Sequence, residues 1–250
     1  MTALGWTLSV TILGSATAMS LSGFFLLLPE IRRRRVLPYL MAYATGTLLG
    51  ASFLELIPHA LEHQRASDTL ALVLAGIVFF FLLERLVLWR HCHENECQVH
   101  GARAPLILVG DAFHNFGDGA VIAAAFLTST PLGLATALAV FSHEIPQEVG
   151  DFAILLSAGY SRAKAFASNA LSASSAVAGA GAAYAFLGDV QSAIPVVMSV
   201  SAASFVYVAL TDLFPELHRE EDRKRGTLQV VLLLAGIATV ALLSQTEHRD

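Results

Sequence analysis

Two stretches near the middle of the chain decide the fold: DAFHNFGDG at residues 111–119 and HEIPQEVGD at residues 143–151. Both carry acids and histidines through apolar surroundings. On a helix, residues three, four and seven positions apart share one face, so each stretch would present its polar side chains together. The first face carries Asp111, His114, Asn115 and Asp118, and the second carries His143, Gln147 and Asp151, with Glu144 and Glu148 beside it. Nitrogen and oxygen donors on facing helices are the ligands of a divalent transition metal.

Composition places these stretches in a membrane protein. Hydrophobic residues make up 55% of the 250, charged residues 14%, and the mean hydropathy is +0.63. A soluble domain has about 25% charged residues, so this chain has too little polar surface for a water-soluble globule. The two cysteines, Cys92 and Cys97, lie in one short polar loop and do not form a disulfide framework of the secreted kind. We expect membrane lipid as a partner and no nucleic acid.

The hydropathy pattern predicts an all-α polytopic fold, a single transmembrane domain over residues 1–250. About 20 apolar residues are needed to cross the hydrocarbon core. Eight stretches of this length qualify as spans, at about residues 6–28, 38–58, 70–89, 104–127, 132–158, 163–187, 191–215 and 227–244. The fourth, fifth and seventh of these predicted spans are more polar than the others.

Basic residues between the spans predict the orientation, because cytoplasmic loops are enriched in Lys and Arg. Four arginines, at 32–35, follow the first span, and the segments 90–103, 159–164 and 216–226 would lie on the same side. These segments hold twelve of the fifteen basic residues, and the opposite side holds only Arg65 and Arg249. We therefore expect a multi-pass protein of the plasma (bacterial inner) membrane with both termini outside.

An internal echo suggests inverted repeats. The second span ends in ELIPH at residues 55–59, and the seventh ends in DLFPE at residues 212–216. Each reads acid, Leu, apolar residue, Pro and a side chain able to bind metal. Since the two spans run in opposite directions, the echo predicts a 3+2+3 arrangement, with spans 1–3 repeated as spans 6–8 and the metal site between helices 4 and 5.

Depth in the membrane supports a metal site. His114 lies about 15 Å from one face and His143 about 17 Å from the other, which is the midplane of a core about 30 Å thick. A charge at that depth costs at least ~2.5–3.5 kcal/mol. A bound divalent cation would neutralise two carboxylates and accept neutral imidazoles as ligands. The polar residues therefore predict a cation that visits the middle of the bilayer.

The two motifs also resemble the signature of the ZIP (Zrt/Irt-like) family of metal transporters. His114-Asn115-x-x-Asp118-Gly119 and His143-Glu144-x-Pro146-x-Glu148-x-Gly150-Asp151 carry the resemblance, in a subfamily with His-Glu-x-Pro-His-Glu-x-Gly-Asp in its fifth span. Gln147 stands where that pattern has a second histidine, which puts zinc selectivity and full occupancy in question.

The resemblance implies a transporter rather than an enzyme. Its substrate would be Zn²⁺, with cadmium, iron or manganese as alternatives, moved into the cytoplasm through a binuclear centre without an organic cofactor. The primary site would be His114, Asp118, His143 and Gln147, and the second site Asn115 and Glu144 with Asn169 from the sixth span; Glu148 lies among them.

Other residues would line the route of the ion. Acids and histidines near the mouths and the midplane site form the predicted pathway: Glu55, His59, Asp111, Asp151, Asp212, Glu216 and His218. The inner loop at 90–103 carries metal-binding residue types and would receive or sense the ion, or be merely solvated. Its candidate ligands are His91, Cys92, His93, Cys97 and His100.

Other classes of function remain open at this stage. The buried polar groups could pair among themselves or relay protons, as in a proton or monovalent cation antiporter, and a selective divalent-metal channel would use similar ligands. An intramembrane zinc protease is disfavoured because the His-Glu-x-x-His pattern lacks its second histidine and Pro146 interrupts the turn. Stripes of small residues facing lipid would permit a homodimer.

Overall fold

The computed structural model describes residues 2–89, 100–218 and 223–244, and every regular element in these ranges is a helix. The fold is that of an all-α polytopic membrane protein. The elements are α1 (Ala3–Leu27), α2 (Glu30–Gly50), η1 (Ala51–Leu56), α3 (Ile57–His63), α4 (Ala66–Trp89), α5 (His100–Thr128), α6 (Thr130–Ser157), α7 (Arg162–Ala173), α8 (Ser175–Asp189), η2 (Gln191–Ala193), α9 (Ile194–Val208), η3 (Ala209–Leu213), α10 (Phe214–Leu217) and α11 (Arg223–Ser244).

Side-chain hydroxyls cap the N-termini of several of these helices. The hydroxyls of Thr2, Ser129 and Ser161 accept hydrogen bonds from backbone N–H groups in the first turns of α1, α6 and α7. Such caps satisfy donors that the start of a helix leaves without a partner. The end of α6 needs a different device: Gly159 has a φ of +86°, a left-handed conformation that favours glycine. These signals keep the turn between α6 and α7 short.

Six stretches in the described part of the chain are long and apolar enough to cross a membrane: Ala3–Phe25, Arg35–His63, Ala66–Leu83, Arg162–Gly188, Gln191–Thr211 and Lys224–Leu243. They correspond to the predicted spans 1, 2, 3, 6, 7 and 8. The seventh predicted span, which we expected to be less apolar than most, is long and apolar enough to be among them. Helices α5 and α6 are long enough but carry the acidic motifs, so the eight-span arrangement remains a prediction.

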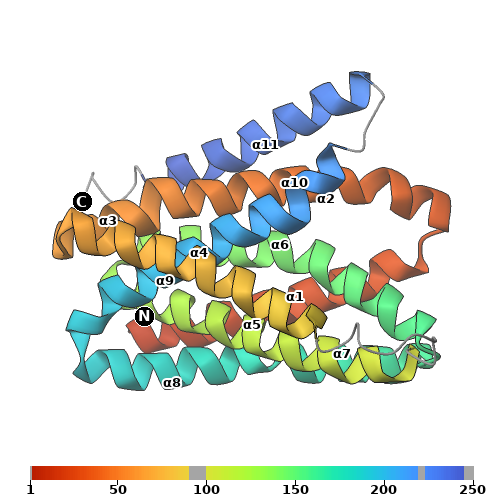
Figure 1. Ribbon diagram of the computed structural model, residues 1–250, viewed down its shortest axis with the longest axis horizontal. Coiled ribbons are helices and arrows are strands. Elements are labelled where there is room, and N and C mark those ends of the chain that lie inside the picture. Colours follow the sequence, from red (N-terminus) through yellow and green to blue (C-terminus); the bar gives the residue numbers. More distant parts are fainter. Residues whose placement is uncertain (1, 90–99, 219–222, 245–250) are drawn as a thin grey trace.

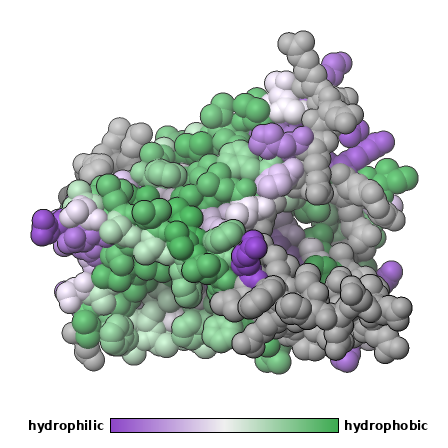
Figure 2. All heavy atoms as spheres, viewed as in Figure 1, coloured by the Kyte–Doolittle hydropathy of each residue, from purple (hydrophilic) through white to green (hydrophobic). Residues whose placement is uncertain are grey.

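The helices form an elongated bundle with two polar ends. Helix α1 begins, α11 ends and α3 lies toward the left of Figure 1, whereas the turns α1–α2 and α6–α7 lie toward the right. Figure 2 shows hydrophilic residues over α3 and the start of α4 on the left, and again on the right, with a mostly hydrophobic surface between them. This is the pattern expected when a bundle spans a bilayer from end to end.

The pairing of helices has an internal symmetry. Helix α2 packs along α11, and α9 packs along α4; likewise α1 packs on α6, and α8 packs on α5. If spans 1, 2 and 3 are exchanged with spans 6, 7 and 8, and span 4 with span 5, the pair α2–α11 becomes the pair α9–α4. By the same exchange the pair α1–α6 becomes the pair α8–α5. The predicted inverted repeat requires this exchange.

Glycines allow the closest of these contacts. A Cβ atom added to Gly119 of α5 would lie 1.8 Å from the carbonyl oxygen of Ala176 in α8, and one added to Gly179 would lie 2.0 Å from that of Phe116. No side chain fits either position, so the backbones of α5 and α8 touch. Helix α5, which carries one of the two motifs, is therefore held in register against α8.

Both halves of the echo contain a wide turn. Residues Ala51–Leu56 and Ala209–Leu213 are π-helical, and Pro58 and Pro215 follow in the next turn. A proline lacks the N–H that would bond to the carbonyl four residues earlier, and π-turns are common where the ladder is interrupted. The residues Glu55 and Asp212, predicted from sequence to correspond, thus lie in the same unusual backbone.

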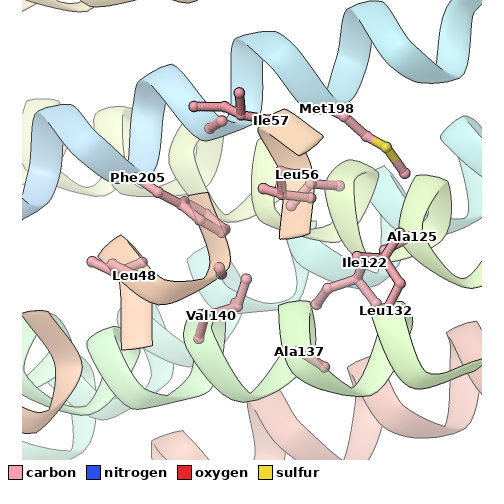
Figure 3. Packing of buried hydrophobic residues seen from close by; sticks show 14 of the residues in the cluster. Leu48, Leu56, Ile57, Ile122, Ala125, Leu132, Ala137, Val140, Met198 and Phe205 are labelled. Carbon is pink, nitrogen blue, oxygen red and sulfur yellow. The ribbon is translucent and has the colours of Figure 1, made fainter. Parts of the chain in front are cut away.

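A cluster of buried apolar side chains fills the bundle on the side of α3, called here the apolar cluster. Figure 3 shows these side chains converging from α2, η1, α5, α6 and α9. Along α6, Val140 comes one turn before His143, and the ring of Phe205 in α9 lies 5.9 Å from that imidazole. The members of the apolar cluster include Leu48, Leu56, Ile57, Ile122, Ala125, Leu132, Ala137, Val140, Met198 and Phe205.

Candidate metal centre

Four potential ligands from α5 and α6 converge in the middle of the bundle: His114, Asp118, His143 and Glu144, called here the four-donor group. The Nε2 atoms of His114 and His143 lie 3.1 Å apart. Oδ2 of Asp118 is 3.5 and 3.1 Å from these two nitrogens, and Oε1 of Glu144 is 3.9 and 3.5 Å from them. Ligands on one tetrahedral Zn²⁺ lie about 3.3 Å apart, since each bond is about 2.0–2.1 Å. The spacing suits a single small cation.

The orientation of His143 favours metal binding. Its Nδ1 lies 3.1 Å from the carbonyl oxygen of Ala139, and a carbonyl can only accept, so Nδ1 carries the hydrogen of this bond. In the neutral ring, Nε2 then presents a lone pair to the Asp118 carboxylate. Nε2 lies 3.1 Å from both Oδ2 of Asp118 and Nε2 of His114, so a cation between these atoms would be bound by all three. The backbone bond would fix the ring as second-shell partners of ligands do.

The burial of these side chains also favours a bound cation. Asp118 is 3% exposed, His143 1% and Glu144 4%. The facing oxygens, Oδ2 of Asp118 and Oε1 of Glu144, accept no hydrogen bond from the described residues. Buried carboxylates with unsatisfied oxygens are costly, because water no longer solvates them. A cation between them would remove this cost.

Gln147 does not join the four-donor group. Its side-chain nitrogen donates to Oδ1 of Asp111 at 3.3 Å, and the amide of Asn115 donates to the same oxygen at 3.0 Å. Amide N–H groups are drawn to a carboxylate that is otherwise buried. The resemblance implied Gln147 as the fourth primary ligand, and that role stays a prediction; Glu144 presents Oε1 3.9 and 3.5 Å from the two imidazole nitrogens and is a second candidate for the position.

A third contact extends this polar region toward α7. Asn169, which is fully buried, donates to Oε2 of Glu148 at 2.5 Å. Oδ2 of Asp111, Oε1 of Glu148 and Oδ1 of Asn169 accept no hydrogen bond within the described part of the chain. Asp151 lies one turn further along α6 and is half-buried. We call Asp111, Asn115, Gln147, Glu148 and Asn169 the second polar group.

Hydroxyl groups hold the backbone around these side chains. Ser22 of α1 donates to the carbonyl of Ile145 at 3.3 Å, directly before Pro146. On the other side, Ser172 donates to Leu108 at 2.9 Å and Ser175 donates to the carbonyl of Ala112 at 2.6 Å. Sequence reasoning did not single out these serines. The signal for Ser172 and Ser175 was the small, polar composition of the sixth span, and Ser22 in the first span had none.

A cavity of about 140 Å³ borders the four-donor group, lined by Met41, His143, Pro146, Gln147, Val208 and Leu213. It lies on the side of the site away from most of the apolar cluster, because Gln147 follows His143 along α6 and Leu213, a member of that cluster, ends η3, which follows α9. The site thus has the bulk of the apolar cluster on one side and, on the other, a small cavity lined by Gln147 and apolar side chains.

The remaining predicted residues fall in several places. Glu55 is buried in η1 and His59 is half-buried in α3. His218 is exposed and its Nδ1 lies 2.8 Å from the carbonyl oxygen of Phe214. The side chains of Asp212 and Glu216 lie outside the described residues. The side chains of the predicted loop ligands also lie outside the described residues: His91, Cys92, His93, Cys97 and His100. Residues 100–103, which we expected in the loop, form the start of helix α5.

Comparison with known proteins identifies the family of the chain. The sequence matches the ZIP zinc transporter family over residues 3–101 and 89–244. The chain belongs to the ZIP family of metal transporters. It is 36% identical to zinc transporter ZIP13 of Pongo abelii, across 83% of this chain and 67% of that protein. It is 30% identical to zinc transporter SLC39A7 of Mus musculus, across 96% and 71% respectively. Like other ZIP proteins, it is a multi-pass membrane transporter and not an enzyme.

Proposed function

We propose that this ZIP protein moves Zn²⁺ into the cytoplasm through the four-donor group, with cadmium, iron and manganese as competing substrates. The observation that carries the proposal is the convergence of two imidazoles and two carboxylates from α5 and α6, with facing atoms 3.1–3.9 Å apart. Mixed nitrogen and oxygen ligands suit zinc and its neighbours better than Mg²⁺ or Ca²⁺, which prefer oxygen alone. The relatives named zinc transporters support this choice of metal.

The asymmetry around the site supports a direction. The apolar cluster would block an ion on the α3 side, and the cavity beside Gln147 would admit water from the other. The second side ends in the segments rich in Lys and Arg, which the sequence assigns to the cytoplasm. This conformation would therefore release metal inward, and an alternate conformation would part the apolar cluster to load it. Both termini would lie outside in a plasma (bacterial inner) membrane crossed eight times.

The second polar group supports a second, weaker metal position. Three of its buried oxygens, from Asp111, Glu148 and Asn169, accept no hydrogen bond from described residues. Asp151 extends the acidic path from there toward the cytoplasm. Gln147 offers only a neutral amide, so it would bridge two ions poorly, and occupancy of the second position would be lower than that of the first.

Metal uptake into proteoliposomes tests the proposal. Replacing His143 with Ala removes a ligand and should abolish saturable zinc uptake. The matched control is Ser142→Ala, since that hydroxyl donates within its own helix, to the carbonyl of Leu138 at 2.6 Å. It should retain uptake. Equal uptake by His143→Ala and the unmodified protein would remove His143 from the pathway.

The same preparation separates the other classes of function. Flux that rises in proportion to the zinc gradient without saturating would identify a channel. A purified protein that binds no zinc and exchanges protons for monovalent cations would identify an antiporter. Competition among zinc, cadmium, iron and manganese during uptake would then establish the preferred metal.

A further inference from the structure

A second set of metal-binding atoms lies at the α3 end of the bundle, outside the site described above. His59, Glu62 and His63 each offer a ligand atom, and these atoms lie within 4.8 Å of one another. Nδ1 of His59 is 3.8 Å from Oε2 of Glu62, and the two imidazole rings stack with centroids 5.0 Å apart. We call these three residues the α3 cluster.

The spacing follows from the helix. Positions 59, 62 and 63 are three and four residues apart, so their side chains share one face. Two donors bound to one zinc ion lie at most about 4.2 Å apart, twice the length of a Zn–N bond. Glu62 and His63 are exposed. A small rotation of the Glu62 side chain would bring all three donors onto one ion.

One histidine is already oriented for the role. Nδ1 of His63 lies 3.1 Å from the carbonyl oxygen of His59, and because a carbonyl only accepts, Nδ1 is the donor. The neutral ring then keeps its Nε2 lone pair for a metal. A backbone bond of this kind fixes the tautomer of many histidines that bind metals.

The backbone adds a favourable field. Helices α2, η1 and α3 follow one another without a break from Glu30 to His63, so the α3 cluster lies at the carboxyl end of a long helix. That end carries partial negative charge, which attracts cations. Arg65 is the nearest basic residue in sequence, and it is exposed.

The position of the cluster suggests its purpose. Glu55, His59 and His63 are successive residues four apart on this helix, leading from the buried Glu55 to the exposed end. The apolar cluster, which includes Leu56 and Ile57 of the same segment, separates them from the four-donor group. Metal at the α3 cluster could therefore be bound while the buried site is closed to that side.

We infer that His59, Glu62 and His63 form a separate, solvent-exposed site for a divalent transition metal such as Zn²⁺, which collects the ion before it enters. Three protein ligands leave a position for water, so the ion can leave rapidly toward Glu55. That the ion enters from this end rests on the proposed direction of transport; the binding itself does not.

Equilibrium dialysis with Zn²⁺ tests the binding. The experiment uses the full chain carrying Asp118→Ala and His143→Ala, which disable the four-donor group. In this background, His63→Ala should lower the zinc stoichiometry by one equivalent, whereas the control Asp68→Asn should not change it. Asp68 is an exposed acid on the neighbouring helix. An unchanged stoichiometry with His63→Ala overturns the site.

Uptake separates this inference from the proposed function. With the four-donor group intact, His63→Ala should raise the half-saturating zinc concentration about tenfold, the lower end of what local cation enrichment contributes, with an unchanged maximal rate. An unchanged half-saturating concentration overturns the collecting role. If the unmodified protein takes up no zinc, the proposed function fails, yet the dialysis difference would still establish or refute the site.

Discussion

The identity of the fourth ligand gives the sharpest test of the buried site, because the resemblance implies Gln147 whereas the four-donor group contains Glu144. Gln147 occupies the position that the family pattern implies, but its amide hydrogen-bonds to Asp111 at 3.3 Å. Glu144 instead places Oε1 3.5 and 3.9 Å from the two imidazole nitrogens. Because Asp111 is not a member of the four-donor group, Gln147→Ala should weaken metal binding there by no more than the loss of a partner of a ligand does, which is about 10–100-fold, or about 1.4–2.8 kcal/mol.

Glu144→Ala should cost more than this hundredfold limit, since it removes one of two carboxylates that would neutralise the ion. Glu144→Gln keeps the size of the side chain and should fall between the two. The assay is zinc competition against a chelator of known affinity, followed at the tightest equivalent bound to the purified protein. If Gln147→Ala weakens binding more than Glu144→Ala does, the four-donor group is wrong and the amide is the ligand.

Three further predictions test the surroundings of the site. Gly179→Ala places a Cβ 2.0 Å from a carbonyl oxygen of α5 and should destabilise the protein by about 1–3 kcal/mol in thermal unfolding, whereas Gly181→Ala, with nothing within 4 Å, should not; equal melting temperatures would contradict the close contact of α5 and α8. Asn169→Ala removes the donor to Glu148 and should lower the zinc stoichiometry by the one equivalent of the second polar group while the tightest equivalent remains, and loss of both would show that these two positions are not separable. Phe205→Ala removes a fully buried ring, which should lower the free energy of unfolding by about 3–5 kcal/mol and increase the leakage of zinc across proteoliposome membranes. An unchanged leak would show that the apolar cluster does not block the ion.

Much of the fold was accessible from sequence because the bilayer imposes simple rules. Apolar length predicted the helices, and six of the eight spans have the expected composition in the structure. Helix ends shifted by a few residues, as at residues 100–103, because polar residues at a membrane surface can extend a helix beyond its apolar part. The echo between residues 55–59 and 212–216 found two segments with the same π-helical backbone, which no rule of propensity would have predicted.

The candidate site was predicted in outline but not in detail. Helical spacing grouped His114 with Asp118 and depth in the membrane placed His143 at the same level, and these three side chains lie within 3.5 Å of one another in the structure. Spacing alone cannot tell which groups of α5 Glu144 and Gln147 approach: Glu144 faces the imidazole of His114, whereas the amide of Gln147 donates to Asp111. The supporting serines could not have been found either, since their partners are backbone carbonyls of distant helices.

The wide turn at Ala51–Leu56 has a consequence for everything beyond it. A π-turn accommodates one more residue than an α-turn, and each residue advances the side-chain direction by about 100°. Removing one residue from this turn would leave the apolar composition of the span unchanged but swing His59, Glu62 and His63 round to another side of the helix axis. The phase of the helix, and not its length or hydropathy, thus decides where these three side chains meet the incoming ion.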